Sequence, residues 1–388
     1  MKRFLVSSIP HSLIFPIWLA IFYATWLGIV LAGDLLKVIG ENWGIAVAMA
    51  VGSYVAGSTP MGGGTVGFPV LVLLFDQSGA IGRDFAFAIQ SIGMVSASIY
   101  ILTRPADTST RNKDRDNQTK STVGGSAGEC NPALDGNPTL DGKPTLESNS
   151  ALDWGFIRPA LVGSLISTPL GVSFLAPQLP DLSVKLIFAV IWASFGLMHL
   201  VKIREFVSYS GQSSRWLVHR GRIGFAVGLL GGLISSITGV GIDMLLYATM
   251  VLMFRSDLKI STPSSVIVMA FTSVVGIAST LALSWISPGQ FSIASEVFQC
   301  WIAAAPVVAL GAPVGAWAVQ RLPRVPTLVL ISILCLIQFL WTLLEEQVSP
   351  AGSLTAIASV LLMNFAFHSL YRLGRPSLTD VETQLKSA

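Results

Sequence analysis

Charged residues are scarce in this sequence: Asp, Glu, Lys and Arg make up 12% of its 388 residues, whereas hydrophobic residues make up 52%. A water-soluble domain carries about a quarter charged residues, so the composition excludes a soluble globular protein. The net charge of +3 is too small to indicate a nucleic-acid partner. The cysteines are too few and too scattered for a disulfide framework or a metal site: Cys130, Cys300 and Cys335. We therefore expect no cofactor, no metal and no nucleic acid.

Long apolar runs are what the chain has in abundance. Several are about 20 residues long, enough to cross the hydrocarbon core of a bilayer, which is roughly 30 Å thick. The first run follows Met1-Lys2-Arg3 as the core of a signal peptide would, but its length predicts a retained helix. The predicted spans are 13–32, 84–102, 157–176, 183–201, 264–286, 296–319, 326–344 and 353–371. The chain is thus predicted to be an all-α integral membrane protein that contacts the lipid bilayer.

Two glycine-rich breaks interrupt apolar segments at equivalent places in the two halves. They read GSTPMGGGTVGFP at 57–69 and GGLISSITGVGIDM at 231–244, within segments 44–75 and 222–254. Each segment is too long for one span, so we predict two helical arms that meet at the glycines and return to the side they entered from. Irregular backbone is tolerated inside a membrane only where protein buries it or it lines a cavity. Paired breaks of this kind are typical of a transporter's binding site.

The distribution of basic residues tests this topology. If the N-terminus is cytoplasmic and both broken segments return, the outer loops are 33–43, 76–83, 177–182, 287–295 and 345–352. Those loops contain only Lys37 and Arg83 as basic residues, as the positive-inside rule requires. We expect Arg83, at the end of a span, to anchor at the membrane interface. The expected location is the bacterial inner membrane, with both termini in the cytoplasm.

The two broken segments then enter from opposite sides, so the halves form inverted-topology repeats. A second similarity between the halves supports the repeat. TPLGVSFLAPQLP at 168–180 resembles APVGAWAVQRLP at 312–323, and the alignment pairs Gly171 with Gly315. The predicted divisions are a peripheral helix and loop (1–43), the first part of repeat 1 (44–102), an insert (103–156), the rest of repeat 1 (157–201), a basic linker (202–221), repeat 2 (222–344), and a peripheral C-terminal helix with its tail (345–388). The polar insert cannot bury enough apolar surface to fold alone, which predicts a disordered cytoplasmic loop.

The first break has the residues of an anion site. Gly62, Gly63 and Gly64 lead into a helix whose N-terminus presents unpaired N–H groups and the positive end of its dipole. Glycines let an anionic group approach the backbone closely, and Thr59 and Thr65 add hydroxyl donors. Because helix ends supply the positive potential, we expect no buried Arg or Lys. The alternative is that the glycines only permit close packing of helices.

The second break offers Thr238, Gly239 and Gly241 to the same site, and Asp243 lies just beyond it. A carboxylate within a membrane is energetically expensive and indicates a function by default. Asp243 is therefore the candidate for coupling transport to a proton or a sodium ion. The alternative is that it caps the end of a helix.

A polar cluster follows early in the next span of each half. The clusters are Gln90 with Ser91, and Thr262 with Ser264 and Ser265. Inside apolar helices such side chains either hydrogen-bond neighbouring helices or face a ligand. Since the clusters recur in both halves, we retain both interpretations and include these residues among the substrate-binding candidates.

Together these features resemble the sulfite exporter TauE/SafE family of membrane permeases. Gly62, Gly63, Gly64 and Pro69 resemble its first motif, and Gly239, Gly241 and the Thr-Pro-Ser-Ser stretch at 262–265 resemble its second. The second half departs from the pattern, since it lacks the glycine run and the following proline. The resemblance covers roughly 44–102 and 157–344, and it implies transport of sulfur-containing anions such as sulfite or organosulfonates.

We therefore predict a secondary transporter that exports small anions by alternating access between the two repeats. An anion channel and a non-transporting membrane scaffold or sensor are the alternatives. An intramembrane enzyme is not expected, because Gly239 to Asp243 has one residue too many for a Gly-x-Gly-Asp turn and no second intramembrane Asp is evident. The expected partners are a small anion, a coupling proton or sodium ion, and a second copy of the chain if the protein is a homodimer.

Overall fold

The computed structural model describes residues 10–59, 61–103, 152–208, 214–318 and 324–374. The chain divides into a main body and a second unit at 104–151. Of the predicted disordered insert, 103–156, residues 104–151 lie outside the described ranges, whereas residue 103 and residues 154–156 belong to helices of the main body. Within the described ranges the chain is helical and contains no strand, which confirms the all-α class.

The first half begins with two peripheral elements, α1 (His11–Ala32) and α2 (Leu36–Glu41). Its remaining elements are α3 (Trp43–Ser58), α4 (Gly64–Pro69), η1 (Val70–Leu74), α5 (Gly79–Thr103), α7 (Trp154–Leu170), η2 (Gly171–Leu175), η3 (Ala176–Gln178) and α8 (Asp181–Ser208). The elements η1 and η2 are π-helical turns that follow Pro69 and Pro169. In η1 the wider turn is closed by the Phe75 amide, which donates to Val70 O at 3.1 Å.

The second half has the same order of long elements. They are η4 (Ser214–His219), α9 (Arg220–Thr238), α10 (Ile242–Leu252), α11 (Leu258–Ile286), α12 (Ser295–Ala318) and α13 (Arg324–Glu345), followed by α14 (Pro350–Leu373). Thus α3 and α4 correspond to α9 and α10, and α5, α7 and α8 correspond to α11, α12 and α13.

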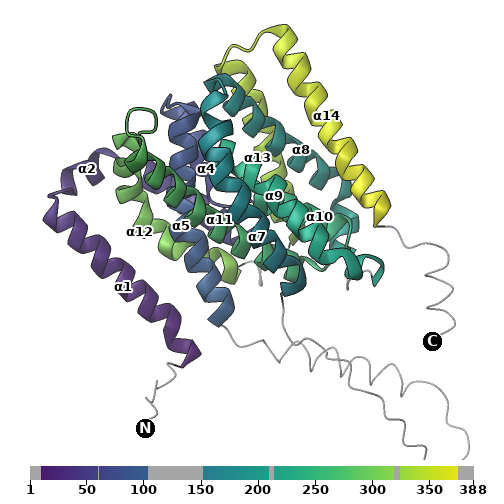
Figure 1. The fold of residues 1–388 in the computed structure, drawn as a ribbon, viewed down its shortest axis with the longest axis horizontal. Helices are drawn as coiled ribbons and strands as arrows, with labels where there is room; N and C mark the ends of the chain where they lie inside the picture. Colours follow the sequence, from purple (N-terminus) through teal and green to yellow (C-terminus); the bar gives the residue numbers. More distant parts are fainter. Residues whose placement is uncertain (1–9, 60, 104–151, 209–213, 319–323, 375–388) are drawn as a thin grey trace, which may run out of the picture. The chain divides into compact units, whose positions relative to one another are not determined.

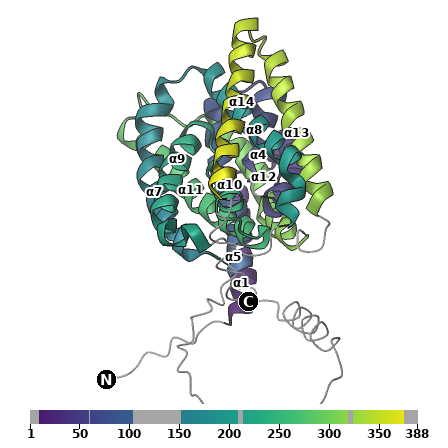
Figure 2. The ribbon, with the colours of Figure 1, turned by 90° about the vertical axis from the view of Figure 1, so that its right-hand side faces the viewer.

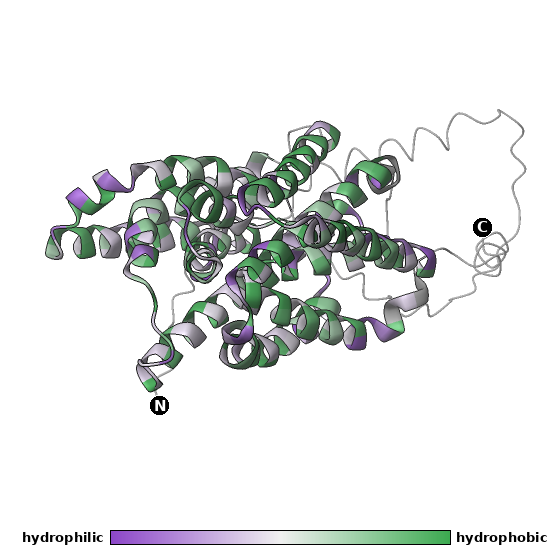
Figure 3. Cartoon of the chain, turned by 90° about the horizontal axis from the view of Figure 1, so that it is seen from above, coloured by the Kyte–Doolittle hydropathy of each residue, from purple (hydrophilic) through white to green (hydrophobic). Residues whose placement is uncertain are grey.

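Nine helices in the described part of the chain are long and apolar enough to cross a membrane. Eight of them match the predicted spans, and the ninth is α9, the first arm of the second broken segment. Helices α1 and α14 lie at opposite edges of the bundle (Figure 1), and only 6% and 17% of their most apolar windows are buried. Seen from above, the helices are largely apolar along their length (Figure 3), as expected of surfaces that face lipid.

Each broken segment folds back on itself. In the first half, Gly44 near the start of α3 lies beside the Phe75 ring that follows η1, and an ideal Cβ at Gly44 would be 3.5 Å from Cζ of that ring. In the second half, Phe156 of α7 contacts both ends: its backbone lies beside Gly224 of α9, and its ring lies 5.3 Å from that of Phe254. The two arms therefore begin and end at the same side of the bundle.

The two halves exchange packing partners. Helix α3 of the first half packs on α12 of the second, and α9 of the second half packs on α7 of the first, which lie side by side in Figures 1 and 2. Small residues allow this approach: a Cβ at Gly57 would collide with the carbonyl of Ala312, and one at Gly228 with that of Ala160. Helix α5 packs on α11, and α8 packs on α13. In both of these pairs a helix of the first half packs on its own equivalent in the second half.

Polar contacts hold loops together at the two ends of the bundle. At one end, Lys185 Nζ lies 3.0 Å from Asp181 Oδ2 and 2.7 Å from Glu346 Oε1, and Asp181 Oδ1 accepts a hydrogen bond from the Gly79 amide. Loops predicted to share the outer side therefore meet. At the other end, Arg220 Nη1 lies 3.4 Å from Asp153 Oδ1.

Candidate functional site

The first break is a turn between α3 and α4 that requires glycine. Thr59 is extended, with φ −140° and ψ 163°, and ends α3. Gly62 has a φ of 63°, in the left-handed region that glycine occupies without strain. The two threonine hydroxyls are bonded within the segment, since Thr59 Oγ1 donates to Val55 O at 2.8 Å and Thr65 Oγ1 donates to Met61 O. Gly63 leaves the start of α4 without a side-chain cap.

The second break has the same shape but different chemistry. Gly239 and Gly241 have φ values of 78° and 115°, and Thr238 Oγ1 donates to Val240 O at 2.8 Å. The amides at the start of α10 already have acceptors. Those of Gly241 and Met244 donate to Asp243 Oδ1 at 3.2 and 2.9 Å. That of Ile242 donates to Ser235 Oγ at 3.2 Å. Asp243 therefore caps this helix, as one sequence interpretation held. At the start of α4 the acceptors are backbone carbonyls instead: the amide of Thr65 donates to Gly62 O at 3.4 Å and that of Val66 to Gly63 O at 3.2 Å.

The two breaks meet at Gln90 of α5. Its Nε2 donates to the carbonyl of Gly239 at 3.2 Å and to that of Ala86, one turn back in α5, at 3.1 Å. A Cβ at Gly62 would lie 2.6 Å from Gln90 Oε1 and 2.7 Å from Asp243 Oδ2. A Cβ at Gly64 would collide with the Val240 side chain. Gly62 and Gly64 therefore pack directly against the second break. Any larger residue at either position would displace the second break or Gln90.

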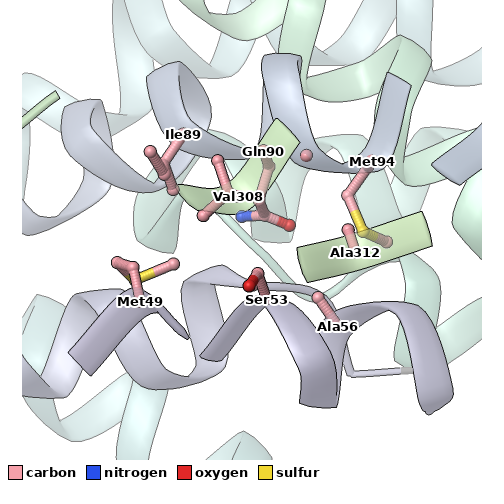
Figure 4. A pocket seen from close by; sticks show the side chains of 10 residues that line it. Met49, Ser53, Ala56, Ile89, Gln90, Met94, Val308 and Ala312 are labelled. Carbon is pink, nitrogen blue, oxygen red and sulfur yellow. The ribbon is translucent and has the colours of Figure 1, made fainter. Parts of the chain in front are cut away.

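A small cavity opens beside Gly63. Figure 4 shows the Gln90 amide projecting between α3, α5 and α12 into this space. The cavity measures about 10 Å³, close to the least room that one water molecule needs, and it is too small for a sulfur oxyanion. The described conformation is therefore closed. The lining residues are Met49, Ser53, Ala56, Gly63, Ile89, Gln90, Gly93, Met94, Val308 and Ala312.

With this geometry established, comparison with known proteins identifies the family. The family model described as "Sulfite exporter TauE/SafE" matches residues 146–370, which is more than half of the chain. The chain belongs to the TauE/SafE family. It is therefore a multi-pass membrane transporter and not an enzyme. No curated protein and no solved structure gives a significant match. The family match begins after the first break and runs through α14, so it includes the second break but not Gly62 to Gly64.

The remaining predicted site residues of this TauE/SafE protein lie elsewhere in their helices. Ser91 is half-buried, and its hydroxyl donates to Ala88 O within α5. In α11, Ser264 Oγ donates to Ile260 O and Ser265 Oγ donates to Thr262 O. These hydroxyls donate to carbonyl oxygens of their own helix rather than to the breaks.

The two polar clusters are not at equivalent depth, contrary to our expectation. Asp76 and Arg255 both have positive φ in the turn before the span, which aligns the two halves. Gln90 lies 14 residues after Asp76, whereas Ser265 lies only 10 residues after Arg255. Gln90 is thus about one helical turn deeper, and it alone reaches the opposite break.

The expectation of no buried basic residue was wrong. Arg83 Nε pairs with Asp84 Oδ1 at 2.8 Å, and their side chains are 13% and 6% exposed; Lys185 is buried as well. Arg83 therefore does not anchor in a solvated interface: its carbonyl lies against Gly239. Asp84 is also a second buried acid that the sequence analysis overlooked. The contact of α5 with the second break could have been inferred from sequence, because Arg83, Ala86 and Gln90 recur at helical spacing and therefore lie on one face of α5.

Proposed function

We propose that this TauE/SafE protein is a secondary transporter that exports a small sulfur-containing anion, sulfite or an organosulfonate. The observation that supports this proposal is the contact between the two breaks at Gln90, deep inside the bundle, beside the start of α4, which has no side-chain cap. Paired breaks at the interface of two repeats are where transporters of this plan hold their substrates.

The anion is placed at the first break. The start of a helix attracts negative charge through its dipole. The amides of Thr65 and Val66 already donate to Gly62 O and Gly63 O, but Gly63 places no side chain between the helix start and the cavity that it lines. At the second break, Asp243 already occupies the amides of α10. The Gln90 side chain donates to Gly239 and lines the cavity, and it would orient the anion once the cavity widens.

Alternating access follows from the way the halves are joined. We infer that they are inverted repeats, because equivalent helices pair across the bundle and α3 and α9 exchange partners. Rocking of one half against the other would separate Gln90 from Gly239 and enlarge the closed cavity. The basic-residue distribution favours the bacterial inner membrane with both termini in the cytoplasm.

Ligand binding tests the proposal first. Purified protein in detergent is heated with sulfite, sulfate, thiosulfate, taurine, sulfoacetate, sulfolactate, formate or acetate. We expect a sulfur oxyanion or sulfonate to raise the melting temperature, because a ligand that binds only the folded state stabilises it. Gly63→Leu should abolish the shift. Gly28→Leu is the control, because a side chain at Gly28 of α1 meets nothing within 4 Å. A response to carboxylates alone would refute the sulfur-anion class.

Flux measurements separate the proposal from its alternatives. In proteoliposomes a carrier shows saturable uptake and counterflow of labelled anion, whereas a channel shows neither. Replacing 104–151 with a flexible linker of about 12 residues, which spans roughly 20 Å, should leave that flux intact. Loss of flux in a folded variant would instead support a role for the insert.

A further inference from the structure

Two buried oxygen atoms at the crossing of the breaks have no hydrogen-bond partner among the residues that the structure describes. They are Gln90 Oε1 and Asp243 Oδ2, and the two residues are 1% and 0% exposed. Both oxygens lie within 2.7 Å of the same point, the position that a Cβ at Gly62 would take. A buried acceptor without a donor is costly, and here two of them, one from each half, face the same glycine.

The orientation of the Gln90 amide is fixed by its other contacts. Its Nε2 donates to two carbonyl oxygens, those of Ala86 and Gly239. Turning the amide over would place Oε1 against both carbonyls and leave two acceptors facing each other. Oε1 must therefore point toward Gly62 and Asp243. Likewise, Asp243 Oδ1 is held by two backbone amides, so Oδ2 is the oxygen that remains.

Within the described ranges of the chain, no basic side chain forms an ion pair with Asp243. On α5 the nearest charges are Arg83 and Asp84, which pair with each other. On α10 the other titratable side chain is Tyr247, which lies 3.4 Å from His199 Nε2 of α8. The charged or titratable residues of the remaining helices packed on α10 stand near the helix ends: Arg220 and Arg222 on α9, Lys259 on α11, and His368, Tyr371 and Arg372 on α14.

We propose that Asp243 and Gln90 form a proton-binding site, in which Asp243 Oδ2 carries the proton and donates it to Gln90 Oε1. One proton satisfies both unpartnered oxygens. Divalent metal ions such as Ca²⁺ and Mg²⁺ take six or more oxygen ligands, and the crossing supplies two that are free. The site joins the halves, because Gln90 belongs to the first and Asp243 to the second.

The consequence for transport rests on the function proposed above. Gln90 belongs both to the proton site and to the lining of the cavity, so an ionised Asp243 would repel an anion beside Gly63. The protonated form removes that repulsion. Anion and proton therefore bind to the same state and are carried together. On the side of release the proton goes from Asp243 to water. The empty carrier then returns with Asp243 ionised, and Asp243 takes up a proton from water on the loading side before the next anion binds.

Proton movement is measured in proteoliposomes that contain a pH-sensitive dye and a sulfonate with no group titrating near neutral pH, such as isethionate. They are diluted into sulfonate-free buffer of equal pH, with the membrane potential clamped by potassium and valinomycin. We expect the lumen to become alkaline as each sulfonate leaves with a proton. Asp243→Asn should still bind the sulfonate but lose the pH change, because its Nδ2 donates permanently to Gln90. Glu41→Gln, in an exposed pair with Lys37, is the matched control.

Sulfonate efflux without a change of lumen pH, or efflux that depends on sodium instead, overturns the proposal. So does a pH change that persists in Asp243→Asn. If the wild-type protein moves no sulfonate, the transport function fails, and the site is then judged on its own by infrared spectroscopy of the purified protein. We expect a C=O band of a protonated carboxyl group at neutral pH, absent in Asp243→Asn and shifted in Gln90→Leu. Absence of that band in the wild-type protein refutes the proton site.

Discussion

Gly63 and Gly62 are neighbours, yet a methyl group should have opposite effects on stability at the two positions. Gly63 has φ −71° and ψ −25°, a helical conformation that alanine adopts readily. A Cβ there would meet Ala56 Cβ at 3.6 Å, Met49 Cε at 3.7 Å and Gln90 Cγ at 3.9 Å, all ordinary van der Waals distances. Alanine also restricts the unfolded chain, so Gly63→Ala should leave stability unchanged or raise it by about 0.5–1 kcal/mol.

Gly62→Ala should destabilise the protein. Its φ of 63° costs an alanine about 1–2 kcal/mol, and the methyl group would displace the Gln90 and Asp243 oxygens, 2.6 and 2.7 Å away. Both variants should lose transport, but for different reasons. The methyl group at Gly63 occupies the cavity, whereas the one at Gly62 separates the two breaks.

The assay combines melting in detergent with anion flux at equal protein content. We expect Gly63→Ala to melt at or above the wild-type temperature and to transport poorly, and Gly62→Ala to melt below it. Wild-type flux in Gly63→Ala would refute the placement of the anion. A melting temperature of Gly63→Ala well below that of the wild type would refute the packing on which the argument rests.

Two further substitutions test the packing of the halves and the polar contacts at the bundle end. Gly57→Ala should prevent folding, because its Cβ would collide with a backbone carbonyl of α12, while Gly28→Ala on the lipid-facing side should be neutral; equal yields of monodisperse protein would contradict this. Lys185→Met should lower stability by about 1–3 kcal/mol, because it leaves the partly buried Glu346 carboxylate unpaired. Lys37→Met, at an exposed position, should change the melting temperature little. An equal fall of the melting temperature in Lys37→Met and Lys185→Met would show that burial of the Lys185 ion pair does not add to stability.

The spans and the two hairpins could be predicted from sequence because both depend on local composition. About 20 apolar residues specify a span wherever they occur, and glycine and proline interrupt a helix by their own covalent structure. The meeting of the breaks was partly predictable, since paired breaks imply a shared interface. The particular residue at that interface was not, because Gln90 and Ser91 are adjacent and only the packing of α5 decides which one faces Gly239.

Hydroxyl side chains illustrate why sequence overstates a polar site. Ser264 and Ser265 looked like ligand donors, but a helix offers every serine a carbonyl three or four residues back, and both use it. The Arg83–Asp84 pair shows the opposite error. Two adjacent charges at the end of a span indicate solvent, and only the tertiary structure reveals that the neighbouring break buries them.

The exchange of partners between the halves has a consequence for how the protein is made. Gly57 of α3 is seated against Ala312 of α12, which leaves the ribosome about 250 residues later. At 5–20 residues per second that interval lasts roughly 10–50 s. In that interval the first hairpin lies in the membrane while the non-helical backbone of its glycine break is not yet covered by α12. Nascent chains of this protein should therefore depend on insertion chaperones until the last helices of the second half have been synthesised.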